Sequence, residues 1–120
     1  MTQVTQRTEP ATLGDLLDRA SRAALAFTKN GRPEIIPVRF LSYEDRYWVG
    51  LTSEAAATLP VGTSVTLVVD DGCWWFDLRA VQVRGVVADG SPPEGGSSPL
   101  HWLEVLPSSV SAWDYGRLHE

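Results

Sequence analysis

Two turn dipeptides, Asn30-Gly31 and Asp71-Gly72, constrain the fold of this chain more than any other feature. Each follows an apolar run with strand character, and each tolerates the positive φ values that a two-residue hairpin turn requires. A third turn, YEDR, separates the strand predicted over residues 34–43 from the run YWVGLT. Further strands are predicted over residues 64–70, 74–89 and 100–106. The sequence therefore predicts a mainly β protein with short helices.

The predicted strand over residues 74–89 changes phase along its length. Trp74, Phe76 and Leu78 are apolar at even positions, whereas the valines at 81, 83 and 87 occupy odd positions. A β-bulge near Arg79-Ala80 would account for this change, because one extra residue moves the following side chains to the opposite face. Such a bend helps a sheet to close on itself, so a small barrel is favoured over a flat sheet.

The two ends of the chain carry weaker signals. Residues 1–11 are polar and without periodicity, so we expect a flexible N-terminal arm followed by a single domain over residues 12–120. Thr12 and Asp15 have the spacing of a capping box, and a short amphipathic helix is predicted from the apolar face Leu13, Leu16, Leu17 and Ala20. The segment from Pro107 to Leu118 is predicted to form a turn or a short helix with proline at its start.

Composition and charge exclude several classes of protein. A chain of 120 residues with a formal net charge of −5 and a pI near 4.9 is poorly suited to bind nucleic acid or anionic membranes. The single cysteine, Cys73, excludes an internal disulfide, and with His101 and His119 it does not have the ligand spacing of a structural zinc site. No apolar run is long enough for a signal peptide or a bilayer span, so we expect a soluble cytoplasmic protein.

The strand predicted over residues 34–43 has two apolar faces. Strand alternation places Ile36, Val38 and Phe40 on one face, and on the other face Ile35, Pro37, Arg39, Leu41 and Tyr43. A barrel interior can bury only one of these faces, so the face with Arg39 must meet a helix, a second subunit or a ligand. The alternative is a surface arginine paired with Glu34, Glu44 or Asp70.

Several short motifs, taken in order, give the chain a family resemblance. They are GRP after the first strand, PV in the second, RG in the long strand and the late pattern P..V..WDY. With the order of the predicted elements, these motifs resemble the flavin-binding split barrels related to pyridoxamine 5'-phosphate oxidase, over nearly the whole chain. The resemblance implies a split β-barrel and a homodimer that holds FMN, or a deazaflavin or heme, at the subunit interface.

The resemblance also implies a cofactor site. Carried over by position, the residues along the isoalloxazine ring would be Pro37, Val38, Arg39 and Phe40. The hydroxyls of Thr52 and Ser53 would approach the phosphate, and Trp113 would lie near the cofactor edge. An arginine and neighbouring hydroxyls are good partners for an anion. The chain departs from the family at Ala55, because the segment SEAAATLP does not supply the lysine that members commonly place there.

Two hypotheses for function follow. The first is an oxidoreductase that uses FMN or a deazaflavin on an unidentified small organic substrate, with the cofactor supplying the chemistry. The second is a non-catalytic split-barrel dimer that has lost its flavin and binds another ligand or acts as a scaffold. The sequence identifies no catalytic residue and no metal site.

Overall fold

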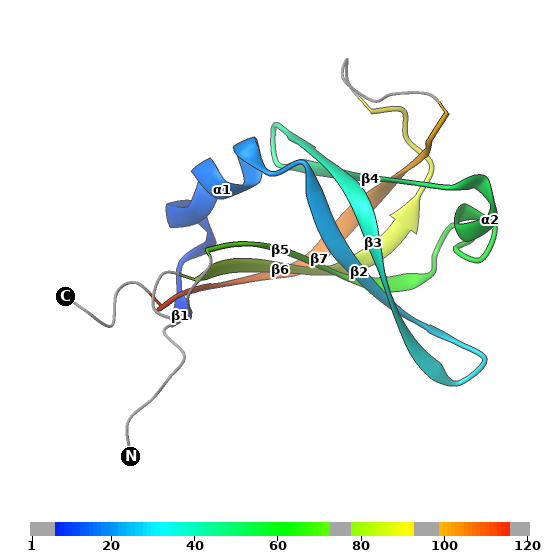
Figure 1. The fold of residues 1–120 in the computed structure, drawn as a ribbon, viewed down its shortest axis with the longest axis horizontal. Helices are drawn as coiled ribbons and strands as arrows, with labels where there is room; N and C mark the ends of the chain where they lie inside the picture. The colour runs from blue at the N-terminus through cyan, green and yellow to red at the C-terminus, as the bar shows by residue number, and fades with distance from the viewer. Residues whose placement is uncertain (1–6, 73–77, 93–98, 116–120) are drawn as a thin grey trace.

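The computed structural model describes residues 7–72, 78–92 and 99–115, and the described chain is mainly β, as predicted (Figure 1). The strands are β1 (Arg7–Thr8), β2 (Arg22–Lys29), β3 (Arg32–Tyr43), β4 (Arg46–Leu51), β5 (Ser64–Asp71), β6 (Arg79–Ala88) and β7 (His101–Asp114). The helices are the 3₁₀-helix η1 (Pro10–Leu13) and the α-helices α1 (Gly14–Arg19) and α2 (Ser53–Ala56). Among these residues no helix is long and apolar enough to cross a membrane.

Six antiparallel strands close into a barrel in the order β7-β4-β3-β2-β5-β6, because β7 pairs with β4 over residues 101–105 and with β6 over residues 104–114. The barrel interior is filled by aliphatic and aromatic side chains such as Leu25, Phe40, Val49 and Leu67. Strand alternation sends one set of side chains inward and the other outward. The predicted split barrel is therefore confirmed.

Two of the three predicted hairpin turns are confirmed. Asn30 and Gly31 have φ values of 52° and 77°, and Glu44 and Asp45 have φ values of 49° and 62°. Positive φ at both central residues gives the turn a twist that matches the flanking strands. The third predicted hairpin does pair β5 with β6, but not through a two-residue turn at Asp71-Gly72, because Asp71 pairs with Arg79. Residues 73–77 of the connection between these strands lie outside the described part of the chain.

The predicted bulge near Arg79-Ala80 is also wrong. Strand β6 keeps its odd-numbered residues buried from Val81 to Val87, and the irregularity lies instead between Arg84 and Gly85. There Arg84 pairs with Ser109 and Gly85 pairs with Pro107, which leaves Ser108 as an extra residue on β7. The Ser108 hydroxyl donates to the Arg84 carbonyl oxygen at 3.0 Å. Trp74 and Phe76, on which the predicted phase change rested, lie outside the described residues.

The turn or helix predicted from Pro107 is replaced by a continuous strand, since β7 extends to Asp114. Proline has no backbone N–H to donate within a sheet, but Pro107 lies at the bulge beside Ser108, where the hydrogen bonds between β6 and β7 are already interrupted. Pairing with β6 satisfies the backbone beyond Pro107, and this long-range partner overrides the local preference for a turn. Residues 116–118 of the predicted segment are not described.

The N-terminal segment is part of the fold as far as it is described. A flexible arm was predicted over residues 1–11, and residues 1–6 of it lie outside the described part of the chain. Strand β1, which belongs to the same predicted arm, pairs with the end of β7. The capping box at Thr12 does not form, because the Thr12 hydroxyl donates to the Glu9 carbonyl oxygen at 2.7 Å and α1 begins at Gly14. Leu13 and Leu16 are buried in the core, so this segment covers the end of the barrel opposite α2 (Figure 1).

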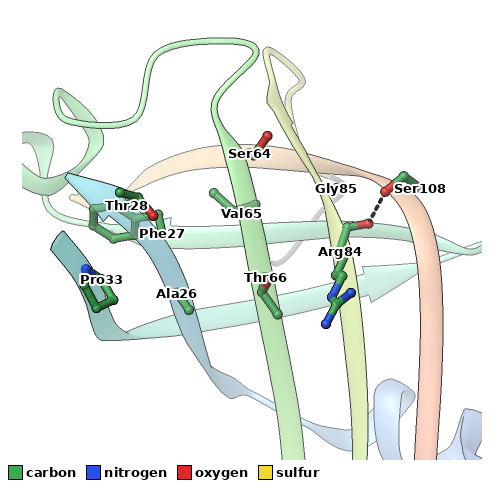
Figure 2. Close-up of a pocket in the computed structure, with 10 residues that line it drawn as sticks. All are labelled: Ala26, Phe27, Thr28, Pro33, Ser64, Val65, Thr66, Arg84, Gly85 and Ser108. Atoms are coloured by element: carbon green, nitrogen blue, oxygen red, sulfur yellow. Dashed lines mark hydrogen bonds between the residues drawn. The ribbon is translucent and has the colours of Figure 1, made fainter. Parts of the chain in front are cut away.

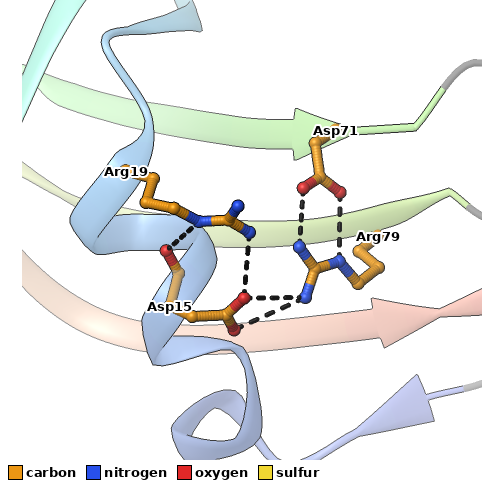
Figure 3. Close-up of polar contacts among 4 residues, drawn as sticks. All are labelled: Asp15, Arg19, Asp71 and Arg79. Carbon is orange, nitrogen blue, oxygen red and sulfur yellow. Dashed lines mark hydrogen bonds and ion pairs between the residues drawn. The ribbon is translucent and has the colours of Figure 1, made fainter.

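Charged side chains join α1 to the barrel (Figure 3). Arg79 makes two hydrogen bonds to Asp71 across the β5–β6 pair, the shorter at 2.6 Å, and its Nη1 atom lies 3.2 Å from an Asp15 carboxylate oxygen. Arg19 contacts the same carboxylate at 3.0 Å. The hydrogen bond from Arg79 holds the pKa of Asp15 below its usual value.

Replacing Asp15 by asparagine is expected to lower the melting temperature at pH 7 modestly. A carboxyl with a depressed pKa contributes stability above its unfolded pKa, and this contribution is lost as the pH falls through the folded pKa. The loss of stability below about pH 4 should therefore be smaller in Asp15→Asn than in the parent. Thermal unfolding from pH 2 to 7 measures this, with Asp18→Asn on the same helix as the control. Parallel curves for Asp15→Asn and the parent would contradict the assigned ion pair.

Candidate functional site

A groove of about 400 Å³ lies on the outside of the barrel where β4 ends and α2 begins. Strand β3 forms one side of the groove, and the first turn of α2 and the residue before β7 form the other. The lining residues are Arg22, Ile36, Pro37, Val38, Arg39, Gly50, Leu51, Thr52, Ala55 and Leu100. The groove therefore combines apolar walls with two arginines and one hydroxyl, and its volume falls within the range of small-molecule sites.

The two arginines of the groove face each other across neighbouring strands. Arg22 of β2 is the direct cross-strand partner of Arg39 of β3, and both side chains are exposed. No other residue in the described part of the chain forms a hydrogen bond or ion pair with either guanidinium, so the alternative pairing of Arg39 with Glu34, Glu44 or Asp70 is not observed. Like charges directly opposite each other are destabilising. The pair therefore attracts an anion to this end of the groove.

Thr52 stands between β4 and α2. Its Oγ1 atom accepts a hydrogen bond from the Ala55 backbone N–H at 3.2 Å, so Thr52 caps the helix. The hydroxyl proton is not used by this bond and can still be donated to a ligand. Ser53, the other predicted hydroxyl, is exposed as the first residue of α2 and does not line the groove.

Strand alternation separates the four site residues that the sequence places on β3. Pro37 and Arg39 are exposed on the outer surface, and Val38 reaches the groove although its side chain is buried. Phe40 is only 1% exposed, and its ring stacks on Tyr47 inside the barrel with centroids 6.3 Å apart. The Phe40 side chain therefore does not reach the groove.

Trp113 lies apart from the groove within one chain. It is near the end of β7, where it pairs with Arg7 of β1 and Ala80 of β6. The groove lies where β7 begins, beside Leu100. A contact between Trp113 and a ligand in this groove would therefore have to come from a second subunit.

Sequence reasoning missed Gly50 and Arg22. Gly50 pairs with Arg39 on one side and Trp102 on the other, and an added Cβ would lie 2.8 Å from the Trp102 ring. An isolated glycine within a strand is a known sign of such close approach. Counting the cross-strand register from the Asn30-Gly31 turn would also have placed Arg22 opposite Arg39. Both signals were present in the sequence.

Beside the groove, an ion pair joins β4 to β7. Glu104 lies on the outside of the barrel wall but is only 5% exposed. Arg46 donates a hydrogen bond to each of its two carboxylate oxygens, at 2.8 and 3.0 Å. The hydrogen bonds that Arg46 donates to Glu104 raise the pKa of Arg46. The Arg46 guanidinium also lies 5.0 Å from the centroid of the Trp48 ring. These contacts join β4, which carries Gly50 of the groove, to β7, which carries its cross-strand partner Trp102.

The described ranges contain no cluster of three or more histidine, cysteine, aspartate or glutamate side chains that could hold a metal ion. The two arginines of the groove favour an anion over a cation, and the Thr52 hydroxyl can donate a hydrogen bond to such a ligand. The chemistry of the groove is therefore that of an anionic ligand with an apolar body.

Comparison with known proteins found no matching family model and no matching curated protein. Solved structures do match. An FAD-binding protein of Mycobacterium smegmatis has a TM-score of 0.72 and 18% identity, covering 91% of this chain and 96% of its own. A candidate pyridoxamine 5'-phosphate oxidase of Corynebacterium glutamicum has a TM-score of 0.68 and 11% identity, covering 94% of both chains. This protein has the fold of the flavin-binding split barrels. The resemblance seen in the sequence is thereby confirmed at the level of the fold.

Another similar split barrel is an FAD- and heme-binding protein of Mycobacterium smegmatis. Its TM-score is 0.69 at 13% identity, and the match covers 91% of this chain and 73% of that one. Proteins of this split-barrel fold therefore include ones described as binding a flavin and one described as binding heme as well.

Proposed function

We propose that this split barrel binds a flavin in the groove beside β3, with the phosphate of the flavin at Arg22 and Arg39. The observation that supports this most strongly is the arginine pair itself. Two guanidinium groups lie opposite each other and have no acceptor among the described residues. An anionic ligand would remove their mutual repulsion and provide charge-assisted hydrogen bonds.

The other lining residues fit the rest of a flavin. Pro37, Leu51, Ala55 and Leu100 offer apolar surface to a flat aromatic ring, and Thr52 can donate a hydroxyl proton to the phosphate. FMN, FAD and phosphorylated deazaflavins share the ring and a phosphate group, so the groove supports this class of ligand. We propose FMN as the simplest member of the class.

A bound flavin would supply hydride or electron transfer, while this chain would supply binding and position. The residues around the groove would hold the phosphate through charge and the ring through apolar contact. On this basis the protein acts as an oxidoreductase on a small organic substrate. The second candidate, a dimer without flavin that binds another anion or acts as a scaffold, is favoured by the missing lysine at Ala55. The cytoplasmic location expected from the composition belongs to the same proposal, and cell fractionation tests it.

The absorption spectrum of the purified protein and a titration with FMN distinguish the two candidates. The flavin proposal predicts saturable quenching of FMN fluorescence and weaker binding of riboflavin, which lacks the phosphate. Parallel titrations with a phosphorylated deazaflavin and with heme compare the other cofactors. A colourless protein that binds none of them would reject the flavin-dependent oxidoreductase and favour the second candidate.

Replacing Ala55 by lysine is expected to tighten FMN binding. Ala55 lines the groove one turn away from Thr52, so a lysine there would add a positive charge near Arg39. The gain should be specific for FMN over riboflavin, because only FMN carries the phosphate. Fluorescence titration of both ligands measures it, with Ala57→Lys, an exposed position at the end of the same helix, as the control. Equal gains for FMN and riboflavin would exclude a phosphate near Ala55.

We also propose that the protein is a homodimer. Beside the outward arginines Arg22 and Arg39 of the groove, other outward residues of β2, β3, β5 and β6 form a broad surface that is mostly uncharged, which we call the outer face: Ala24, Ala26, Ile35, Pro37, Ser64, Thr66, Val68, Asp70, Ala80, Gln82, Arg84 and Val86. Ile35 is 70% exposed at its edge. An exposed surface of this composition is typical of a subunit interface.

Replacing Ile35 by glutamate is expected to dissociate this dimer. The substitution places a charge in apolar surface that a second copy would bury. Light scattering after size-exclusion chromatography, at micromolar protein, should give a dimer for the parent and a monomer for Ile35→Glu. Val61→Glu serves as the control, because Val61 is 62% exposed in the loop before β5 and away from the outer face. A monomeric parent would reject the homodimer.

A further inference from the structure

One row of residues crosses four neighbouring strands at the groove. Arg22 of β2 pairs with Arg39 of β3, which pairs in turn with Gly50 of β4. On its other side Gly50 pairs with Trp102 of β7. Residues directly opposite each other on paired strands share one face of the sheet, so the row lies on the outside of the barrel along its whole length. With strands about 4.8 Å apart, its three steps span about 14 Å. The row therefore joins the two cations of the groove to an indole ring.

The indole of Trp102 lies over Gly50. A Cβ atom at Gly50 would be 2.8 Å from Cη2 and Cζ2 of the indole, which belong to its six-membered ring. The ring therefore extends from β7 across β4, towards the strand that carries Arg39. Gly50 lines the groove, and so does Leu100, two residues before Trp102. Because Trp102 is only half-buried, the indole borders this end of the groove with apolar surface that a ligand can reach.

We infer that Trp102 recognises the aromatic ring of the ligand, and that Gly50 positions the indole for this contact. The inference rests on the flavin site proposed above and deepens it, because it gives the ligand a direction, with the phosphate at the arginine pair and the ring at Trp102. Aromatic rings that stack or meet edge to face attract each other beyond the effect of burial alone. Glycine is required at position 50, because any side chain there would occupy the place of the indole. The ligand class is therefore a planar aromatic ring with an anionic tail.

A second hollow that contains an arginine does not have this arrangement. Its volume is also about 400 Å³, and Figure 2 shows Arg84 of β6 at one side of it. The row through Arg84 continues with Thr66 of β5 and Ala26 of β2. The aromatic ring of this hollow, Phe27, follows Ala26 along β2 and so lies outside the row (Figure 2). Of these two hollows, only the groove therefore aligns paired cations with an indole.

Replacing Trp102 by leucine tests the inference, because leucine keeps apolar bulk and removes the aromatic ring. The dissociation constants of FMN and riboflavin should both rise about tenfold, since both ligands carry the ring. Trp102→Phe retains an aromatic ring and should bind both ligands within about threefold of the parent. Isothermal titration calorimetry measures the constants, and circular dichroism verifies that each variant is folded. The control is Tyr43→Leu, which removes an exposed aromatic ring of β3 outside the groove and should change neither constant.

Replacing Gly50 by alanine tests the positioning of the indole. The added methyl group displaces the indole, so both constants should again rise about tenfold. Combining Gly50→Ala with Trp102→Leu should cause no further rise, since the clashing ring is already absent. Additive losses in the double variant would show that Gly50 acts independently of Trp102, and would overturn the positioning role.

The outcomes separate this inference from the flavin site on which it rests. A parent protein that binds neither FMN nor riboflavin overturns both. If Arg39→Ala weakens FMN binding while Trp102→Leu binds riboflavin as the parent does, the flavin site stands and the role of Trp102 is overturned. A loss for FMN alone in Trp102→Leu, or an equal loss in Tyr43→Leu, also overturns that role. Equal losses for FMN and riboflavin in Trp102→Leu, with recovery in Trp102→Phe, support it.

Discussion

Replacing Gly85 by alanine is expected to destabilise the protein by about 4 kcal/mol or more. A Cβ atom at this position would overlap the Leu106 carbonyl oxygen and lie 2.8 Å from its carbon and 3.1 Å from the Pro107 Cα. These are backbone atoms of β7, so no side-chain rotation can relieve the overlap. The contact lies at the bulge where β6 and β7 pair to close the barrel. Denaturant unfolding followed by circular dichroism measures the loss.

Gly14→Ala is the matched control for this substitution. Gly14 begins α1 with a helical backbone, and an added Cβ would meet no other atom within 4 Å. Alanine is favoured over glycine in a helix by about 0.5–1 kcal/mol, so this variant should be as stable as the parent or slightly more stable. If Gly85→Ala unfolds at the same denaturant concentration as the parent, β6 and β7 do not approach each other as described.

Replacing Arg39 by alanine is expected to weaken FMN binding by about 1.5–3 kcal/mol, which is roughly a 10- to 150-fold rise in the dissociation constant. This range applies to a hydrogen bond between charged groups. The fold should be little affected, because Arg39 is exposed and removal of its charge relieves repulsion with Arg22. Quenching of FMN fluorescence measures the binding, and thermal unfolding verifies the fold.

Riboflavin and Arg32→Ala provide the controls for this second prediction. Because riboflavin lacks the phosphate, its binding should change little in Arg39→Ala. Arg32 lies on the same strand but outside the groove, so Arg32→Ala should bind FMN as the parent does. If Arg39→Ala also binds FMN as the parent does, Arg39 is a structural surface arginine.

Local signals predicted the hairpins correctly where the turn residues alone decide the structure. Asn30-Gly31 and Glu44-Asp45 adopt positive φ values within tight turns. Asp71-Gly72 is likewise a favourable turn dipeptide, but the pairing of Asp71 with Arg79 makes the connection longer. That pairing depends on strands that are distant from the dipeptide itself. Dipeptide chemistry shows that a turn is favourable, and the register of the sheet decides where it ends.

The continuation of the C-terminal strand beyond Pro107 could not be predicted for a related reason. The segment after Pro107 is rich in serine and has the composition of a turn, yet it pairs with β6 to close the barrel. Barrel closure is a long-range contact, and its stabilisation does not appear in the local pattern. The bulge was misplaced for the same reason, since it is set by the close approach of Gly85 to Leu106 and Pro107.

The candidate site was predicted in part. Pro37, Val38, Arg39 and Thr52 line one groove, and their contact with a cofactor stays a prediction. Phe40 points into the barrel, which strand alternation alone already indicates. Arg22 was missed because its importance appears only when the hairpin register places it opposite Arg39. The site is thus readable from the sequence once the strands are paired, and less so from motifs alone.

Titration of the isotope-labelled protein with FMN, followed by NMR of the backbone and arginine side-chain N–H groups, tests the central claim most directly. Binding in the groove predicts the largest shifts at Arg22, Arg39, Gly50 and Thr52, with the arginine side chains unaffected by riboflavin. Saturating shifts confined to another surface, or no shifts with FMN, would contradict a flavin site in this groove.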